Sequence, residues 1–366
     1  MIDFDFFKRL FDSDNLAELT QTTEGLLWLK LKSISRGTIL DEFYAQLNVP
    51  SVKGTAQKFK SLYEILLENP QEAHLQIDVF IRQKTALLSV ERENSLVSEL
   101  YRVQHFDWGG DYKNALDKYL IDTYVKEYPS YETINRMLET EIPRAVYGYV
   151  ICSWYNHWST ILIENIFKKH PKVLPAVGNV KKVDFFIDNI PFDLKVTYLP
   201  TNFVEMCRKQ EGLKSEFSHL KSTAKILNIA YGSDGRQKDV FAEIVARFKD
   251  SALPEAHMAL KEITDFRKNL AKQCVKNPRK LIQNLYEEQG EMRFDASNRL
   301  FLILIDTADF DASWKLKRNI DALTTTINTY VDAFDSRNID KMAVSFSHKA
   351  KNGVFTAFSD ALFVVK

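Results

Sequence analysis

The stretch Val183–Thr197, VDFFIDNIPFDLKVT, decides how the rest of this 366-residue chain is interpreted. It predicts two short strands joined by a tight turn, because apolar and polar residues alternate on both sides of Asp188-Asn189. Side chains two apart on a strand share a face, so Asp193 and Lys195 are expected to project together. The hairpin then brings Asp184 of the first strand within reach of both.

Two carboxylates and an ammonium on the edge of an apolar sheet indicate a site for a hard divalent cation. Carboxylate oxygens suit Mg²⁺, with Mn²⁺ as a substitute, and substrate phosphate oxygens complete the coordination. A lysine beside the metal orients water and neutralises charge on a phosphate, which phosphodiester hydrolysis requires. The alternative is a solvated hairpin face with a cross-strand ion pair.

The order Asp184, then Asp193-Leu194-Lys195, resembles the PD-(D/E)xK nuclease superfamily, to which most type II restriction endonucleases belong. The resemblance implies catalytic roles for Asp184, Asp193, Lys195 and a glutamate on the preceding helix, here Glu164. Asp184, Asp193 and Glu164 would be the metal ligands. Val183 stands where the motif name has proline, a residue that is not catalytic in the family.

This resemblance implies a Mg²⁺-dependent endonuclease that acts on DNA, most simply a type II restriction enzyme. It further implies a homodimer and a cognate methyltransferase, within a restriction-modification system that defends a prokaryotic host against phage. Two alternatives stay open. One is a defence or repair nuclease of the same fold that recognises DNA structure, and the other is a DNA- or protein-binding module without catalysis.

Composition and local motifs exclude several other classes of protein. Lys and Arg together number 49, as do Asp and Glu, which argues against a histone-like binder but allows a local basic groove. The three cysteines lie far apart and form no zinc or disulfide pattern, so a location in the reducing cytoplasm is expected. No apolar run approaches the length of a membrane span, so no membrane association is expected. A second acidic-x-Lys sequence, Asp111-Tyr112-Lys113, follows two glycines without a preceding strand and is not expected to be catalytic.

The predicted fold is α/β (α+β), with a restriction-endonuclease-like mixed sheet flanked by helices. Residues 1–143 form a helix-rich N-terminal domain that is a possible DNA-recognition unit, and residues 144–366 form the nuclease domain. Within the N-terminal domain, His74–Ser89 is either a strand or another helix, and the alternation of Leu75, Ile77, Val79 and Ile81 favours the strand. Strands are also expected at residues 300–306, 343–347 and 355–365.

Basic residues predict two DNA contacts near this nuclease core. Lys181 and Lys182 precede the first hairpin strand, and a helix over residues 261–285 carries basic residues at spacings of about four. Such a stripe can follow a phosphate backbone, although it is equally typical of a solvated helix face. The residues of the stripe are Arg267, Lys268, Lys272 and Lys276.

Overall fold

The computed structural model describes residues 4–13, 15–106, 116–180, 183–232, 237–288, 298–348 and 351–366. Asp111-Tyr112-Lys113, Lys181 and Lys182 therefore lie outside the described residues. The strands are β1 (Val173–Val180), β2 (Val183–Ile187), β3 (Ile190–Tyr198), β4 (Asn298–Ile305), β5 (Ala343–His348) and β6 (Lys351–Val365).

Helices precede, connect and cover these strands. Those before the sheet are α1 (Phe4–Asp12), α2 (Leu16–Leu19), α3 (Thr23–Ser33), α4 (Gly37–Gln46), α5 (Thr55–Leu66), α6 (Pro70–Lys84), α7 (Val90–Tyr101), α8 (Leu116–Leu120), the π-helix η1 (Ile121–Val125), α9 (Tyr131–Glu139) and α10 (Glu141–Lys169). Between β3 and β4 lie α11 (Thr201–Gln210), α12 (Glu216–Ile226), α13 (Gln237–Lys249), α14 (Pro254–Lys276) and α15 (Arg279–Glu287). Between β4 and β5 lie α16 (Ile320–Ala333) and the 3-10 helices η2 (Phe310–Arg318) and η3 (Ser336–Met342).

One mixed sheet with the strand order β1-β2-β3-β4-β6-β5 occupies the centre of the molecule. β1, β2 and β3 form an antiparallel meander, β4 and β6 continue the sheet in parallel, and β5 pairs antiparallel with β6 at the edge. The mixed α/β class and the helix-rich N-terminal region expected from the sequence are confirmed. The hairpin is also present, whereas β1 was not expected.

The β2–β3 turn is formed by Asp188 and Asn189, which both have positive φ angles of 47° and 67°. Asp and Asn tolerate this left-handed backbone better than other non-glycine residues, and two such residues in succession suit a two-residue hairpin turn. A buried lysine of α3 anchors the turn: Lys30 Nζ donates to Asn189 Oδ1 at 2.8 Å and to Asp78 Oδ1 at 2.7 Å. The hairpin is therefore attached to the N-terminal helices.

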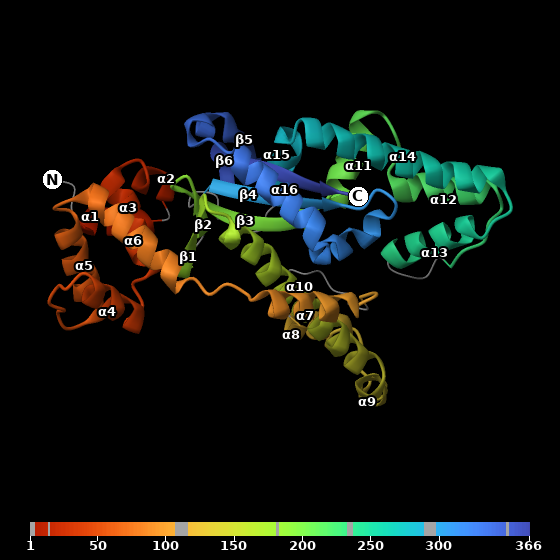
Figure 1. Cartoon of the computed structure of the whole chain (residues 1–366). Coiled ribbons are helices and arrows are strands. Elements are labelled where there is room, and N and C mark those ends of the chain that lie inside the picture. Colours follow the sequence, from red (N-terminus) through yellow and green to blue (C-terminus); the bar gives the residue numbers. More distant parts are fainter. Residues whose placement is uncertain are drawn as a thin grey trace.

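Two helical layers cover the faces of the sheet (Figure 1). On one face, α10 and α16 bury Phe167 and Ile327 against Phe192, Leu194 and apolar residues of β4. On the other face, α11, α14 and α15 pack over Phe301, Ile303 and Ile305 of β4. α1 to α6 lie beside β1, while α12 and α13 extend with α14 beyond the opposite side of the sheet (Figure 1).

The strand predicted within His74–Ser89 is wrong, because α6 occupies Pro70–Lys84. Asn69 caps this helix through its side chain, and Pro70 stands at its first turn, where a missing N–H costs nothing. Ile77 and Ile81 are buried at helical spacing, whereas Leu75 and Val79 are 65% and 51% exposed. The apparent alternation thus combined residues from two sides of one helix.

One helical region predicted after the hairpin is divided into two helices. The helix predicted over 261–285 divides at Asn277-Pro278 into α14 and α15, because proline cannot continue the hydrogen-bond ladder of α14.

None of the helices in the described residues is long and apolar enough to cross a membrane, including α10 with its 29 residues.

Candidate active site

Asp184 and Asp193 project from the same face of the β2–β3 hairpin. Phe185 pairs with Phe192 across the two strands, and both rings lie in the core beneath α10 and α16. The residues that alternate with them point the other way, as the period of a strand requires. On this second face, Phe186 packs among the N-terminal helices and Phe301 of β4 packs beneath α15.

The Asp184 carboxylate is held from one side by the backbone of β3. Its Oδ2 accepts the Leu194 N–H at 2.8 Å. Burial raises the pKa of Asp184 above its ordinary value. The negative charges of Asp193 and Glu164 also raise this pKa, whereas the Leu194 N–H and the Lys195 ammonium lower it. The electrostatic environment of Asp184 therefore includes every other side chain expected at the site.

Asp193 is 6% exposed and makes ion pairs with two cations. Lys195 Nζ donates to Oδ1 at 2.6 Å, and Arg299 Nε donates to Oδ2 at 3.0 Å. The Lys195 side chain is 48% exposed, but the Arg299 side chain is only 4% exposed. A buried carboxylate needs such compensation, because an unpaired buried charge is strongly unfavourable.

Glu164 lies on α10 and bonds within its own helix, with Lys168 Nζ 2.9 Å from Glu164 Oε2. Its side chain is 28% exposed. Across the described residues, no three or more Asp, Glu, His or Cys side chains are grouped so as to hold a metal ion. The expected cluster of Glu164 with Asp184 and Asp193 as three ligands is therefore not assembled, and the hairpin contributes two carboxylates.

Arg299 is the member of this cluster that the sequence analysis missed. It is paired with Asp193 by the parallel β3–β4 register, although 106 positions separate the two residues in the chain. The available signal was an arginine at the start of LFLILID, a run otherwise typical of a strand buried on both faces.

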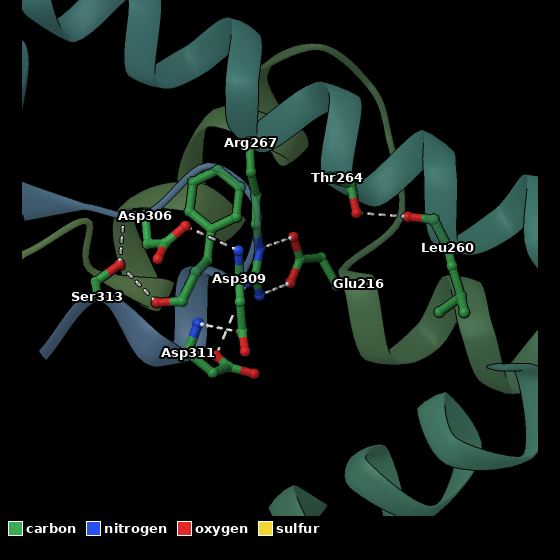
Figure 2. A network of polar contacts seen from close by, with 9 residues as sticks. Glu216, Leu260, Thr264, Arg267, Asp306, Asp309, Asp311 and Ser313 are labelled. Carbon is green, nitrogen blue, oxygen red and sulfur yellow. Dashed lines mark hydrogen bonds and ion pairs between the residues drawn. The ribbon is translucent and has the colours of Figure 1, made fainter. Parts of the chain in front are cut away.

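Arg267 does not face solvent with the rest of the predicted basic stripe. Its Nε and Nη2 donate to the two oxygens of Glu216, at 2.8 Å from Oε1 and 2.5 Å from Oε2. Figure 2 shows this bidentate pair joining α14 to α12, next to Asp309 and Asp311 at the start of η2. Because the Glu216 side chain is only 2% exposed, Arg267 has a packing role, and the stripe reduces to Lys268, Lys272 and Lys276.

Of these three lysines, Lys272 and Lys276 are exposed and Lys268 is half-buried. They project from the C-terminal half of α14, whose opposite side buries Leu270, Ala271 and Cys274 against the sheet. The basic face of this helix is thus directed away from the core.

No protein-family model, curated protein or solved structure matches the chain. The interpretation of the site rests on its own residues.

Proposed function

We propose that this protein is a Mg²⁺-dependent endonuclease that hydrolyses DNA phosphodiester bonds, in the manner of a type II restriction enzyme. One observation carries the proposal: Asp184 and Asp193 share a face of adjacent strands, and the half-exposed Lys195 ammonium lies 2.6 Å from Asp193. The sheet supports it: apart from the unexpected strand β1, a helix, the β2–β3 hairpin and a helical crossover to a parallel strand follow in the order that the PD-(D/E)xK resemblance implies.

The donor atoms of the hairpin fit a hard divalent cation. Both ligands are carboxylates, and Asp184 uses only Oδ2 for the backbone of β3. Oxygen donors of this kind, completed by water and phosphate oxygens, are what Mg²⁺ prefers. When bound, the cation would stabilise negative charge on the phosphate and make a coordinated water more acidic.

The side chains of the site have different roles in the proposed reaction. Asp184 and Asp193 would hold the cation, and each is fixed by a bond to the protein. Lys195, on a flexible stem and partly in solvent, orients the attacking water and offsets charge that builds up on the phosphate. Glu164 adds negative charge near Asp184 while bonded to Lys168, so its role is electrostatic or that of an orienting residue.

A specific observation also favours a second candidate, a DNA-binding module without catalysis. Both oxygens of Asp193 are bonded to cations, so the network is electrically satisfied without a metal. In that case the cluster stabilises the hairpin only. The two functions differ in whether the protein cuts DNA and whether cutting depends on Lys195.

Plasmid cleavage with Mg²⁺ or with excess EDTA tests the proposal. Wild-type protein is expected to cut only with the metal, and Lys195→Ala is expected to cut 10²–10³-fold more slowly while still binding DNA, because it loses one transition-state contact. Discrete fragments indicate restriction, and nicking or smearing indicates a less specific defence or repair nuclease.

Lys126→Ala is the matched control, since Lys126 also pairs with a nearby aspartate, Asp122, at 2.7 Å on the exposed surface. Its cleavage rate should equal that of the wild type. Equal rates for the Lys195→Ala and Lys126→Ala proteins, or cleavage that persists in excess EDTA, contradict the proposed chemistry. DNA binding without any cleavage supports the non-catalytic module.

The restriction assignment carries two further proposals about partners. A symmetric double-strand cut is most simply made by a homodimer, whose twofold axis matches that of the DNA site. A cognate methyltransferase would protect the host DNA. Sedimentation of the protein on its cleavage substrate distinguishes a dimer from a monomer independently of the chemistry.

A further inference from the structure

Arg299 lies beside the proposed metal ligands but has no role yet in the proposed reaction. It is the second residue of β4 and lies directly opposite Asp193 in the parallel β3–β4 register. Its Nε donates to Asp193 Oδ2 at 3.0 Å, and its side chain is 4% exposed. Since both partners are buried, this ion pair is protected from the screening that weakens surface pairs.

The surroundings of Arg299 fix its position from three sides. Its guanidinium carbon lies 5.3 Å from the ring centroid of Tyr286, and that ring stacks on Phe346 at 4.6 Å. The hydroxyl of Ser359 on β6 donates to the Arg299 carbonyl at 2.8 Å. The side chain is held by an aromatic face and a carboxylate, and the backbone by the sheet, so the guanidinium has little freedom to move.

In each of the two aspartates, one carboxylate oxygen accepts a hydrogen bond from a fixed group of the protein. Asp184 uses Oδ2 for the Leu194 N–H, and Asp193 uses Oδ2 for Arg299 Nε. Asp193 Oδ1 is bonded to Lys195, whose side chain is about half exposed and flexible. Lys195 can therefore leave Oδ1, whereas Arg299 is held on Oδ2.

We propose that Arg299 is a positioning residue that clamps Asp193 through Oδ2, so that only Oδ1 of Asp193 would be left to face a divalent cation. The inference rests on the proposed nuclease function. Lys195 is the exchangeable partner of Oδ1, and with a cation at Oδ1 its ammonium would be free to face the water and phosphate. Residues that orient a ligand in this way commonly change metal affinity or activity 10–100-fold when they are replaced.

The clamp has an effect that simple support of the fold lacks. Without Arg299, Asp193 gains a second free oxygen and the site loses a positive charge, so a divalent cation is attracted at least as strongly. The ligand is no longer fixed, however, and the reacting groups lose their alignment. Maximal rate should fall although metal binding does not weaken.

The experiment compares Arg299→Met with wild type in two measurements. Calorimetry with Mn²⁺ alone should give a dissociation constant no higher than that of the wild type. Plasmid cleavage at saturating Mn²⁺ should be 10–100-fold slower. Arg299→Lys, which keeps the charge but cannot reproduce the planar guanidinium fork, should recover part of the lost rate.

Arg318→Met is the matched control, because Arg318 is also buried and lies over the rings of Tyr101 and Trp314. Both arginine-to-methionine variants should lower the melting temperature, but only Arg299→Met should lower the maximal rate. If Arg299→Met does not fold, Arg299→Lys decides the question, and its rate at saturating Mn²⁺ must then lie below that of the wild type.

An unchanged maximal rate in the folded Arg299 variants overturns the inference. So does a rate that is low only because Mn²⁺ binds more weakly and that returns at high Mn²⁺. In both cases wild-type cleavage leaves the nuclease proposal standing. Wild-type protein that neither binds Mn²⁺ nor cuts DNA removes the nuclease proposal itself, and the clamp with it.

Discussion

Asp360 on β6 is a carboxylate whose ionisation opposes folding. Burial raises its pKa above the ordinary 3.8, although the Ala361 N–H and the Tyr330 hydroxyl, 3.2 Å from Oδ2, oppose this. The folded protein then binds the proton more tightly than the unfolded chain does, so the cost is present above the raised pKa and disappears as the pH falls toward 3.8 and below.

Asp360→Asn should therefore raise the melting temperature at pH 7 by about 1–3 °C, with the difference shrinking toward pH 3.8. The Tyr330 hydroxyl can rotate to accept from the new amide. Asp335→Asn is the opposite case, because the bond from Arg337 lowers the pKa of Asp335. This variant should not raise the melting temperature at pH 7. Thermal melts between pH 3.5 and 7.5 check both, and an Asp360→Asn protein that is less stable at every pH contradicts the prediction.

Single residues also show what the sequence could reveal of the site. Asp193 and Lys195 were predictable as a pair, because a two-residue spacing in a strand places them on one face whatever the fold. Arg299 was not, since its contact with Asp193 depends on a parallel register across 106 positions. For Glu164, the lysine four residues later in the same helix was visible in the sequence and offered it a local partner.

At the scale of elements, predictions held where burial decides the pattern of apolar residues and failed where capping residues decided the structure. β4 reads as a continuous apolar run because helices cover both of its faces. α6 contains four apolar residues at alternate positions, yet Asn69 and Pro70 start a helix there. The start signal was present in the sequence and outweighs a periodicity of four residues.

The basic face of α14 leads to a prediction about DNA affinity. If Lys268, Lys272 and Lys276 contact phosphates, changing each to Glu should weaken binding to all sequences alike. It should also reduce the slope of log affinity against log salt by about 0.9 for each lost contact. Lys225→Glu on the exposed side of α12 is the control and should leave the slope unchanged. Fluorescence anisotropy measured between about 50 and 200 mM salt gives this slope. An unchanged slope assigns these lysines to a solvated helix face.

At the scale of the whole molecule, the hairpin joins two cores. Phe185 packs beneath α10 and α16, and its neighbour Phe186 packs among α1 to α6. The turn between β2 and β3 is bonded to Lys30 of α3. The position of Asp184 therefore depends on both the N-terminal helices and the sheet, which could not be deduced from local patterns because these contacts join residues more than 100 positions apart.

This shared core leads to a prediction about cutting the chain at the expected boundary between residues 143 and 144. A 144–366 fragment would expose four apolar residues of β1 and β2 that α1 to α6 bury: Leu174, Val180, Val183 and Phe186. Exposing them costs about 6–12 kcal/mol at roughly 1.5–3 kcal/mol each, as an upper estimate, which is comparable with the whole stability of a typical domain.

The fragment expressed alone should therefore aggregate or lack a cooperative thermal transition, while co-expression with residues 1–143 should restore a folded complex. Thermal melts and size-exclusion chromatography of the fragment, the co-expressed pair and the full chain measure this. Co-expression is also the control for damage by the new chain ends, because the pair carries the same cut. A fragment 144–366 that melts cooperatively by itself would show that the sheet does not need the N-terminal helices, and Lys30 would then be a local anchor without wider consequence.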